Sequence, residues 1–268
     1  MGNFNLYWDD IHKKYNSTYD DWLNKYTKLF RKDFKFVELG CGRAYSSNYL
    51  ISSGFINVIA TDFSTEVLKI VQEENRNLET MLFDMTGGLP FGDNSIDVVI
   101  ADLCLHYFDT ETTKYIIKEI LRTLKPDGYL LVRVNSIKEI KNNNNLEKID
   151  HNFYFDGNIY KRYFDEEDCK YYFKDFKIYY LEEKNMSRYD NPKVLWELCL
   201  RKNWVKEKAS LFSEAFIYNS LPKYFFIKLF SSLAFIGFGK YSSNPSFKYN
   251  SRIPEMALAV RAITGGIT

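Results

Sequence analysis

The chain has 268 residues, 46% of them hydrophobic, and its 36 basic residues nearly balance 35 acidic ones. This composition excludes an intrinsically disordered chain, and the net charge of +1 provides no overall field for attracting nucleic acid. Four cysteines, at positions 41, 104, 169 and 199, form no CxxC pair and no metal-ligand spacing. We therefore expect reduced thiols in a cytoplasmic protein without a bound metal.

The first 34 residues are predicted to be helical, because Trp22, Tyr26, Leu29 and Phe30 recur at helical spacing among charged residues. Short apolar runs then alternate with amphipathic stretches. The runs predict strands at 34–39, 57–62, 79–84, 96–103 and 129–135. The stretches between them predict helices at 45–53, after a Ser64 cap, and at about 111–124, where the KPDG sequence ends the helix.

Apolar strands separated by helices indicate a parallel sheet that is covered on both faces. Right-handed crossovers then give a doubly wound fold, with its ligand crevice at the carboxyl ends of the strands. Residues 176–190 and 193–203 predict two long antiparallel strands joined at Asn191–Pro192. The predicted α/β fold is therefore Rossmann-like and doubly wound, with a seven-stranded sheet that is mostly parallel and has an antiparallel C-terminal strand.

The composition changes after residue 203, so we predict a domain over 1–203 and an aromatic-rich helical extension over 204–268. The apolar run at 221–239 is interrupted by Pro222, Lys223 and Lys228, which is unfavourable for a transmembrane span. We expect 204–240 either to lie at a membrane interface or to pack against the first domain or another subunit.

The strongest local signal is VELGCGRA (37–44), where a strand ends and a helix begins. Gly40 and Gly42 allow a sharp turn and a close approach of the backbone to a ligand. Asp62 ends the next strand, 22 residues beyond Gly40. A carboxylate at that position can accept hydrogen bonds from both hydroxyls of a ribose.

The residues beside the turn bear on which nucleotide it binds. A dinucleotide motif would need a third glycine where this chain has Tyr45. Glu38, two residues before the first glycine, would repel a pyrophosphate but suits a ligand that carries an ammonium group. S-adenosylmethionine has an ammonium, a sulfonium and no phosphate. The alternative for Glu38 is a carboxylate that is solvated or paired with a helix.

Four segments together resemble the motifs of class I S-adenosylmethionine-dependent methyltransferases, of the small-molecule, methyltransferase-11/25-like type. They are VELGCGRA, the strand ending at Asp62, LFDMTGGLPFGDNSIDVVIADLCLHYF (82–108) and ILRTLKPDGYLLVRVNS (120–136). The match runs from about residue 30 to 136 in the family's order and spacing. Ala44 departs from it, since many members have a third glycine there.

The resemblance implies S-adenosylmethionine as cofactor. The methionine end would contact the first turn and the end of the fourth strand, the ribose and adenine the ends of the second and third strands. The cofactor-binding residues implied are Glu38, Gly40, Cys41, Gly42, Asp62, Phe63, Asp84, Met85, Asp102 and Leu103. An ordinary turn aspartate is the alternative for Asp84.

Catalysis and acceptor binding are less constrained by the sequence. His106 is the candidate general base because its ordinary pKa is near neutrality, and packing within the apolar LCLHYF run is its alternative. Candidate acceptor-binding residues are Tyr15, Arg133, Asn135 and Arg162, which alternatively are polar residues of the sheet edge and loops. Tyr15 could also form a lid over the cofactor together with Tyr7 and Trp8.

These observations favour a methyltransferase that acts on a small molecule, with no nucleic-acid partner. A second hypothesis is an S-adenosylmethionine-binding module without catalysis that serves as an interaction or regulatory subunit. A third is an enzyme that uses NAD or a nucleotide sugar, which would bind a pyrophosphate ligand.

Overall fold

The computed structural model describes residues 7–8, 10–11, 19–142, 145–189 and 193–203. The chain divides into two units, Met1–Leu211 and Phe212–Thr268, and every described residue lies in the first. The predicted domain boundary at 203/204 and the predicted helical extension over 204–268 lie outside the described residues and stay predictions.

Seven strands form the main sheet in the order β3-β2-β1-β4-β5-β10-β9. Neighbours from β3 to β5 are parallel, and β10 is antiparallel to both of its neighbours. This arrangement confirms the predicted sheet. Its strands are β1 (Lys35–Leu39), β2 (Asn57–Asp62), β3 (Glu79–Leu82), β4 (Ile96–Asp102), β5 (Leu124–Asn135), β9 (Phe176–Met186) and β10 (Lys193–Lys202).

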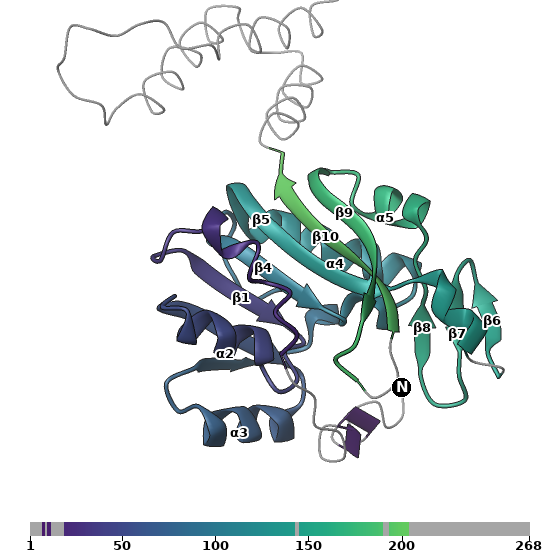
Figure 1. Cartoon of the computed structure of the whole chain (residues 1–268), viewed down its shortest axis with the longest axis horizontal. Coiled ribbons are helices and arrows are strands. Elements are labelled where there is room, and N and C mark those ends of the chain that lie inside the picture. Colours follow the sequence, from purple (N-terminus) through teal and green to yellow (C-terminus); the bar gives the residue numbers. More distant parts are fainter. Residues whose placement is uncertain (1–6, 9, 12–18, 143–144, 190–192, 204–268) are drawn as a thin grey trace, which may run out of the picture. The chain divides into compact units, whose positions relative to one another are not determined.

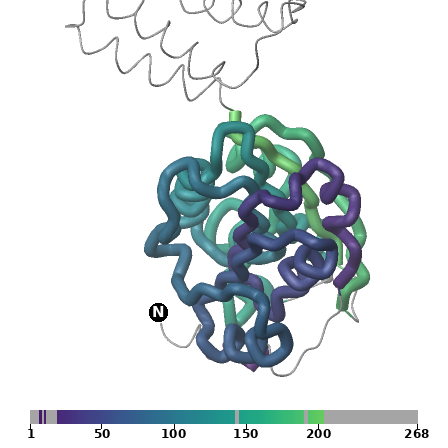
Figure 2. Tube along the Cα trace, turned by 90° about the vertical axis from the view of Figure 1, so that its left-hand side faces the viewer, coloured from purple at the N-terminus to yellow at the C-terminus, as the bar shows by residue number. Residues whose placement is uncertain are grey.

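Helices cover both faces of the sheet, as Figures 1 and 2 show. Helices α2 (Tyr45–Ser52) and α3 (Thr65–Glu74) pack on one face, and α4 (Thr110–Thr123) and α5 (Glu166–Tyr172) pack on the other. The central strands supply side chains to both layers in alternation. In β4, Val98 belongs to the α2–α3 core and Val99 to the α4–α5 core.

The predicted N-terminal helix is wrong for residues 19–34, which form bends, turns and one short 3-10 helix, η1 (Thr27–Leu29). Asp21 has a φ of 58°, a left-handed conformation that a helix cannot include. Trp22, Tyr26 and Phe30 are nevertheless buried in the α2–α3 core. Their helix-like spacing in the sequence therefore comes from an irregular segment that lies across the sheet, and not from a helix.

The KPDG sequence ends α4 as predicted, but it belongs to β5, which starts at Leu124 and not at residue 129. In the pairing with β4, Ile96 lies opposite Leu124 and Val98 lies opposite Tyr129. The four KPDG residues between Leu124 and Tyr129 therefore form an irregularity within the strand. Gly128 is required there, because a Cβ atom would lie 2.9 Å from the carbonyl oxygen of Lys125. Strands β3 and β9 also end earlier than predicted, at Leu82 and Met186.

A second, three-stranded sheet was not predicted. It consists of β6 (Glu147–Asp150), β7 (Phe153–Phe155) and β8 (Tyr160–Arg162), all antiparallel, and follows η4 (Ile137–Asn142). Its strands are too short for a clear hydrophobic period, so the sequence predicted no strands here and indicated only Arg162 as a candidate acceptor-binding residue. The bridge between Ser136 and Phe164 connects this region to the end of β5.

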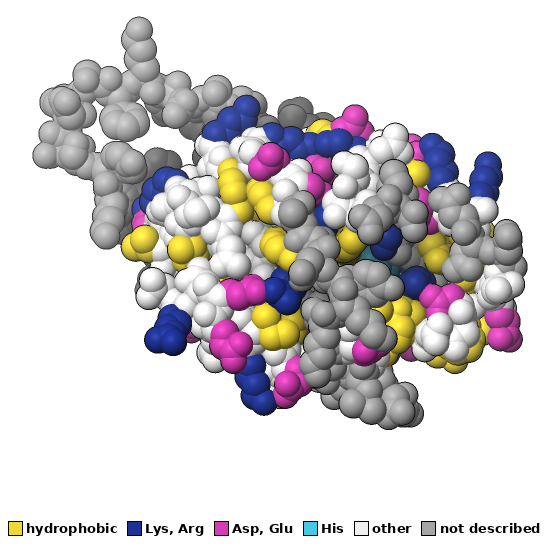
Figure 3. All heavy atoms as spheres, turned by 60° about the horizontal axis from the view of Figure 1, so that its bottom comes forward, with side chains coloured by type: hydrophobic (Ala, Val, Ile, Leu, Met, Phe, Trp, Pro, Cys, Tyr) yellow, Lys and Arg dark blue, Asp and Glu magenta, His cyan; other side chains and the backbone are white. Residues whose placement is uncertain are grey.

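Acidic and basic side chains are interspersed on the molecular face in Figure 3, with hydrophobic groups between them. The described residues contain no helix with the length and apolar character that crossing a membrane requires.

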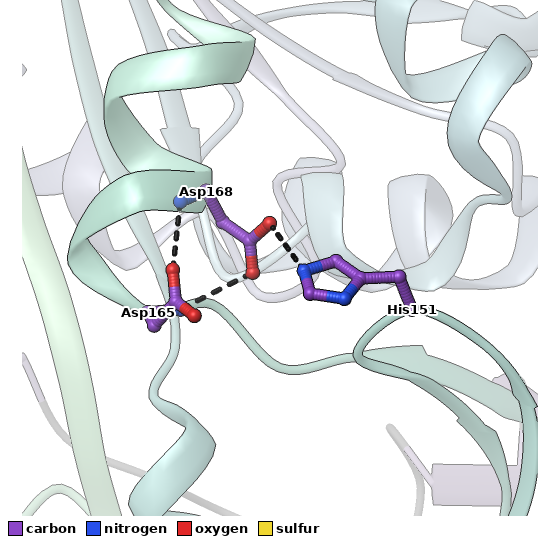
Figure 4. A group of neighbouring side chains, drawn as sticks. All are labelled: His151, Asp165 and Asp168. Carbon is purple, nitrogen blue, oxygen red and sulfur yellow. Dashed lines mark hydrogen bonds and ion pairs between the residues drawn. The ribbon is translucent and has the colours of Figure 1, made fainter.

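Helix α5 begins with a reciprocal hydrogen-bonded cap (Figure 4). The Asp165 side chain accepts from the backbone N–H of Asp168 at 2.7 Å, and the Asp168 carboxylate accepts from the N–H of Asp165. His151 adds a contact from the loop before β7, with Nε2 3.2 Å from Oδ1 of Asp168. The three side chains are close enough to share a metal ion, but capping already accounts for the positions of both carboxylates.

We expect Asp165→Ala to lower the free energy of unfolding by about 1 kcal/mol, because it leaves an N–H of the first turn without its acceptor. Urea denaturation measures this change. Glu167→Ala is the matched control, since Glu167 is an exposed residue in the same turn and should leave stability nearly unchanged. Equal effects of the two substitutions would contradict a capping role.

Candidate active site

The order of the sheet reverses between β1 and β4, and the crevice lies at their carboxyl ends. The turn after β1 passes very close to the residues after β4. Gly40 has a φ of 56°, and a Cβ atom there would lie 2.7 Å from Cβ of Cys104. Both the conformation and the space therefore require glycine. The predicted residues of the first and fourth strand ends are thus brought together.

Asp62 shapes the same turn. Its Oδ2 accepts from the N–H of Gly42 at 3.0 Å, and its Oδ1 accepts from the N–H of Ser64 at 3.0 Å. The N–H of Cys41 donates to the carbonyl of Thr61 at 2.8 Å. Ser64 caps α3 as predicted, by accepting from the N–H of Val67. The half-buried Phe63 lies between Asp62 and this cap. Asp62 therefore organises the turn, and its contact with a ribose stays a prediction.

Glu38 is buried, with 3% of its surface exposed, and it pairs with the first turn of α2. Its Oε2 accepts from the N–H of Ser47 at 2.9 Å and from the Ser47 hydroxyl at 2.5 Å. Burial, together with the negative charge of Asp102, raises the pKa of Glu38 to about 7, although the bonds from Ser47 oppose this shift. The structure thus has the helix-paired arrangement, and contact with an ammonium group stays a prediction.

Asp84 and Met85 follow β3 beside the same crevice. The exposed Asp84 caps the short helix η2 (Met85–Gly87) and accepts from the N–H of Thr86 at 2.9 Å. Met85 is buried, and its Cε would lie 3.6 Å from a Cβ atom on Gly40. Met85 therefore lies beside the glycine turn, and its packing against an adenine ring stays a prediction. Asp84 has the role of a turn aspartate here, and its bond to adenine stays a prediction.

Four charged residues form a network at the ends of β4 and β5. Arg133 binds Asp102 through two hydrogen bonds, of 2.7 and 2.8 Å, and Asp20 through one of 2.6 Å. Arg188 bridges the same carboxylates, at 2.8 Å from each. Burial would raise the pKa of Asp102, but the two guanidinium groups outweigh it and lower that pKa to about 2. Leu103 follows with a φ of 58° and donates its N–H to the carbonyl of Arg133.

The predicted acceptor residues do not all lie together. The Arg133 guanidinium is engaged in the network and lies 4.5 Å from the ring centroid of Trp22. Arg162 is buried, donating to the His151 carbonyl and the Thr110 hydroxyl. Its guanidinium also lies near the rings of Phe153 and Tyr172, so its observed partners belong to the small sheet and α4–α5. Tyr15 lies outside the described residues.

His106 and Asn135 are both adjacent to the crevice and buried. His106 lies in η3 (Leu105–Tyr107), directly after β4, and Asn135 ends β5. Burial lowers the pKa of His106 well below its ordinary value, and the charges of Lys193 and Lys161 lower it further. The imidazole is therefore neutral at pH 7. Tyr107 beside it packs against the ring of Trp8, 4.8 Å between centroids, while a lid role for Trp8 stays a prediction.

The sequence did not indicate Asp20, Ser47, Arg188 or Lys193 as site residues. A polar residue in the first turn after a glycine motif could have suggested Ser47 as the partner of Glu38. Asp20 and Arg188 bind each other across 168 positions of sequence, and no local pattern connects them.

A separate open cavity of about 300 Å³ lies where residues 20–25 meet β5, β9 and β10. Arg133 lines it, and so does Glu197, which is paired with β5 next to Arg133. Glu197 accepts from the Tyr26 hydroxyl at 2.6 Å and pairs with Lys25 at 2.6 Å. Since Glu197 already has these partners, the cavity wall is held together without a ligand.

We expect Asp102→Asn to lower the free energy of unfolding by about 3–5 kcal/mol, because two buried guanidinium groups would share the single carboxylate of Asp20. Denaturant unfolding of the full chain measures the loss. Asp93→Asn provides the control, because Asp93 forms an exposed ion pair with Arg122 and should change stability little. A similarly small effect at Asp102 would show that the network contributes little to stability.

Part of the chain is similar to known proteins. Residues 37–132 match the family model for a methyltransferase domain. Phosphoethanolamine N-methyltransferase 1 of Triticum aestivum is 29% identical over 135 residues, which are 48% of this chain and 26% of that protein. A probable tRNA methyltransferase 9B of Mus musculus is 26% identical over 151 residues, 52% of this chain and 32% of that protein. The chain spans about a quarter to a third of the length of these relatives.

The fold matches solved structures over a larger share of the chain. An S-adenosylmethionine-dependent methyltransferase of Methanosarcina mazei superposes with a TM-score of 0.58 and 19% identity, covering 70% of this chain and 99% of that one. At this identity the likeness concerns the fold alone. Residues 37–132 therefore match a methyltransferase-domain family, on a fold that the chain shares with solved S-adenosylmethionine-dependent methyltransferases.

Proposed function

We propose that the chain transfers a methyl group from S-adenosylmethionine to a small-molecule acceptor. The observation that carries the proposal is the pair of carboxylates beside the glycine turn. Burial raises the pKa of the Cys41 thiol in this turn, and the negative charges of Asp62 and Glu38 raise it further. This acidic surrounding attracts a sulfonium and an ammonium group and repels a pyrophosphate. It therefore favours S-adenosylmethionine over a dinucleotide or nucleotide-sugar ligand.

The proposed class of acceptor is inferred from the charge of the protein. The net charge is +1, and acidic and basic groups alternate on the face of Figure 3, which favours a small molecule over a nucleic-acid backbone. The names of the two relatives include both acceptor kinds, phosphoethanolamine and tRNA. The competing hypothesis is an S-adenosylmethionine-binding module without catalysis. Glu38 and Asp62 serve binding under both hypotheses, so turnover must decide between them.

Methyl transfer is an in-line displacement that depends mainly on positioning. The bond between sulfur and the methyl carbon breaks, its electron pair stays on sulfur, and a new bond forms between the methyl carbon and the acceptor. The Glu38 carboxylate would hold the ammonium end of the donor, and Asp62 its ribose. A protonated nucleophile must also lose a proton, and the neutral imidazole of His106 is the group we assign to accept it.

We also propose a cytoplasmic location, which the four free and buried cysteines support. Contacts of residues 204–240 with a membrane surface or a second subunit belong to this proposal as well, but those residues lie outside the described part.

Two measurements test the proposed function. Calorimetry with S-adenosylmethionine and S-adenosylhomocysteine establishes binding, and donor consumption in the presence of pools of small metabolites establishes transfer. Binding without turnover on any pool would favour the module, and binding of a pyrophosphate ligand in place of the sulfonium compound would overturn the assignment.

Asp62→Ala should weaken the binding of S-adenosylhomocysteine by roughly tenfold to a hundredfold, since it removes a charged acceptor from the ribose and from the turn. Calorimetry measures the affinity, and a denaturation curve verifies that the variant is folded. Asp33→Ala is a suitable control because Asp33 is exposed before β1, at the opposite edge of the sheet. An unchanged affinity would remove Asp62 from the cofactor site.

Binding of S-adenosylmethionine should strengthen as the pH rises towards 7. The pKa of Glu38 is about 7 in the free protein, so at lower pH the ammonium group must displace a proton from the carboxyl group. Between pH 5.5 and 7 we expect a gain in affinity on the order of tenfold. Glu38→Gln should weaken binding and remove this dependence. The same slope in the variant would mean that another group titrates.

A further inference from the structure

Several buried polar atoms in the described residues have no hydrogen-bond partner, and two of them lie beside the crevice on uncharged side chains. They are Nδ1 of His106, a residue with 1% of its surface exposed, and Oδ1 of Asn135, with 5% exposed. Helix η3, which carries His106, contacts both β5 and β8. Buried polar atoms in proteins are normally paired, so two such atoms at one edge indicate a place that a ligand completes.

Lys193 adds a positive charge at this place that has no ion-pair partner among the described residues. It begins β10, two residues before Leu195, which pairs with Asn135 on β5. Its ammonium lies 4.7 Å from the centroid of the Tyr189 ring, and in the described ranges it forms no ion pair. Burial lowers the pKa of Lys193, and the charge of Lys161 lowers it further. Lys193 is half-buried, and a cation that has lost part of its hydration is stabilised when an anion binds beside it.

The other charges around Lys193 already have partners. Lys161 pairs with Asp156 at 2.7 Å, and Arg188 is held by Asp20 and Asp102. Glu139, the acidic residue that acts on Lys193, accepts from the N–H of Val194 at 2.6 Å. Lys193 is therefore the cation here that is available to a ligand.

We propose, on the basis of the methyl-transfer function above, that the acceptor is an anion. Its carboxylate or phosphate group pairs with Lys193, and the polar group next to the methylated atom binds the unpartnered atoms of His106 and Asn135. Binding of the anion also offsets the positive charge that Lys193 exerts on His106. The imidazole then becomes a stronger base when the acceptor is present, and its proton acceptance is coupled to correct binding.

The test uses the full chain with S-adenosylmethionine and a small-metabolite extract that ion exchange has separated into anionic, neutral and cationic fractions. Formation of S-adenosylhomocysteine should occur with the anionic fraction. Treating that fraction with alkaline phosphatase abolishes the reaction if the recognised group is a phosphate, and amidation of its carboxyl groups abolishes it if the group is a carboxylate. Either result supports the proposal.

Lys193→Met should lower the rate at limiting anionic fraction by roughly tenfold to a hundredfold, because a charge-assisted contact is lost. Lys193→Arg should restore part of the rate, and the affinity for S-adenosylhomocysteine should stay unchanged in both. Lys177→Met is the control, since Lys177 is exposed at the far end of β9. If the methionine variant does not fold, Lys193→Gln takes its place.

Turnover confined to the neutral or cationic fraction would overturn the anionic acceptor and leave the methyltransferase function standing. An unchanged rate of Lys193→Met on the anionic fraction would overturn the anionic acceptor in the same way. Binding of S-adenosylhomocysteine without turnover on any fraction would instead overturn the proposed transfer, and this inference with it.

Discussion

The site depends on how closely the turn after β1 approaches the residues after β4. A side chain at Gly40 would overlap Cys104, with 2.7 Å between the two Cβ atoms. Because the backbone itself fills this contact, the ends of the two strands are held at a fixed separation. Glu38, Asp62 and Met85 then reach one crevice from three different strand ends. The acidic surroundings of the turn follow from this geometry, and these surroundings distinguish a sulfonium cofactor from a pyrophosphate.

Most of the sheet could be predicted because its determinants are local. Each central strand is a continuous apolar run, and a glycine, a proline or a cap such as Ser64 marks its neighbours. The N-terminal segment was mistaken for a helix because Trp22, Tyr26 and Phe30 are buried at helical spacing on an irregular backbone. The three-stranded sheet escaped prediction because strands of three or four residues cannot show a period.

The residues of the candidate site were likewise predictable only in part. The glycine turn and Asp62 could be predicted because each lies at the end of a strand that the local sequence indicates. The partners of Asp102 and Arg133 could not, since Asp20 comes from the N-terminal segment and Arg188 from the region after β9. Pairing between such distant residues depends on the completed fold. The same holds for Lys193, which reaches the end of β5 only through the position of β10 in the completed sheet.

The network of Asp20, Asp102, Arg133 and Arg188 also links two segments that lie far apart in the sequence. Asp20 is bound to Arg133 and Arg188 to Asp102, these two form a buried pair, and Asp20 and Arg188 also bind each other. Releasing either segment leaves an uncompensated charge that weakens the attachment of the other. The shared charges therefore couple the stability of the N-terminal segment to that of the segment after β9.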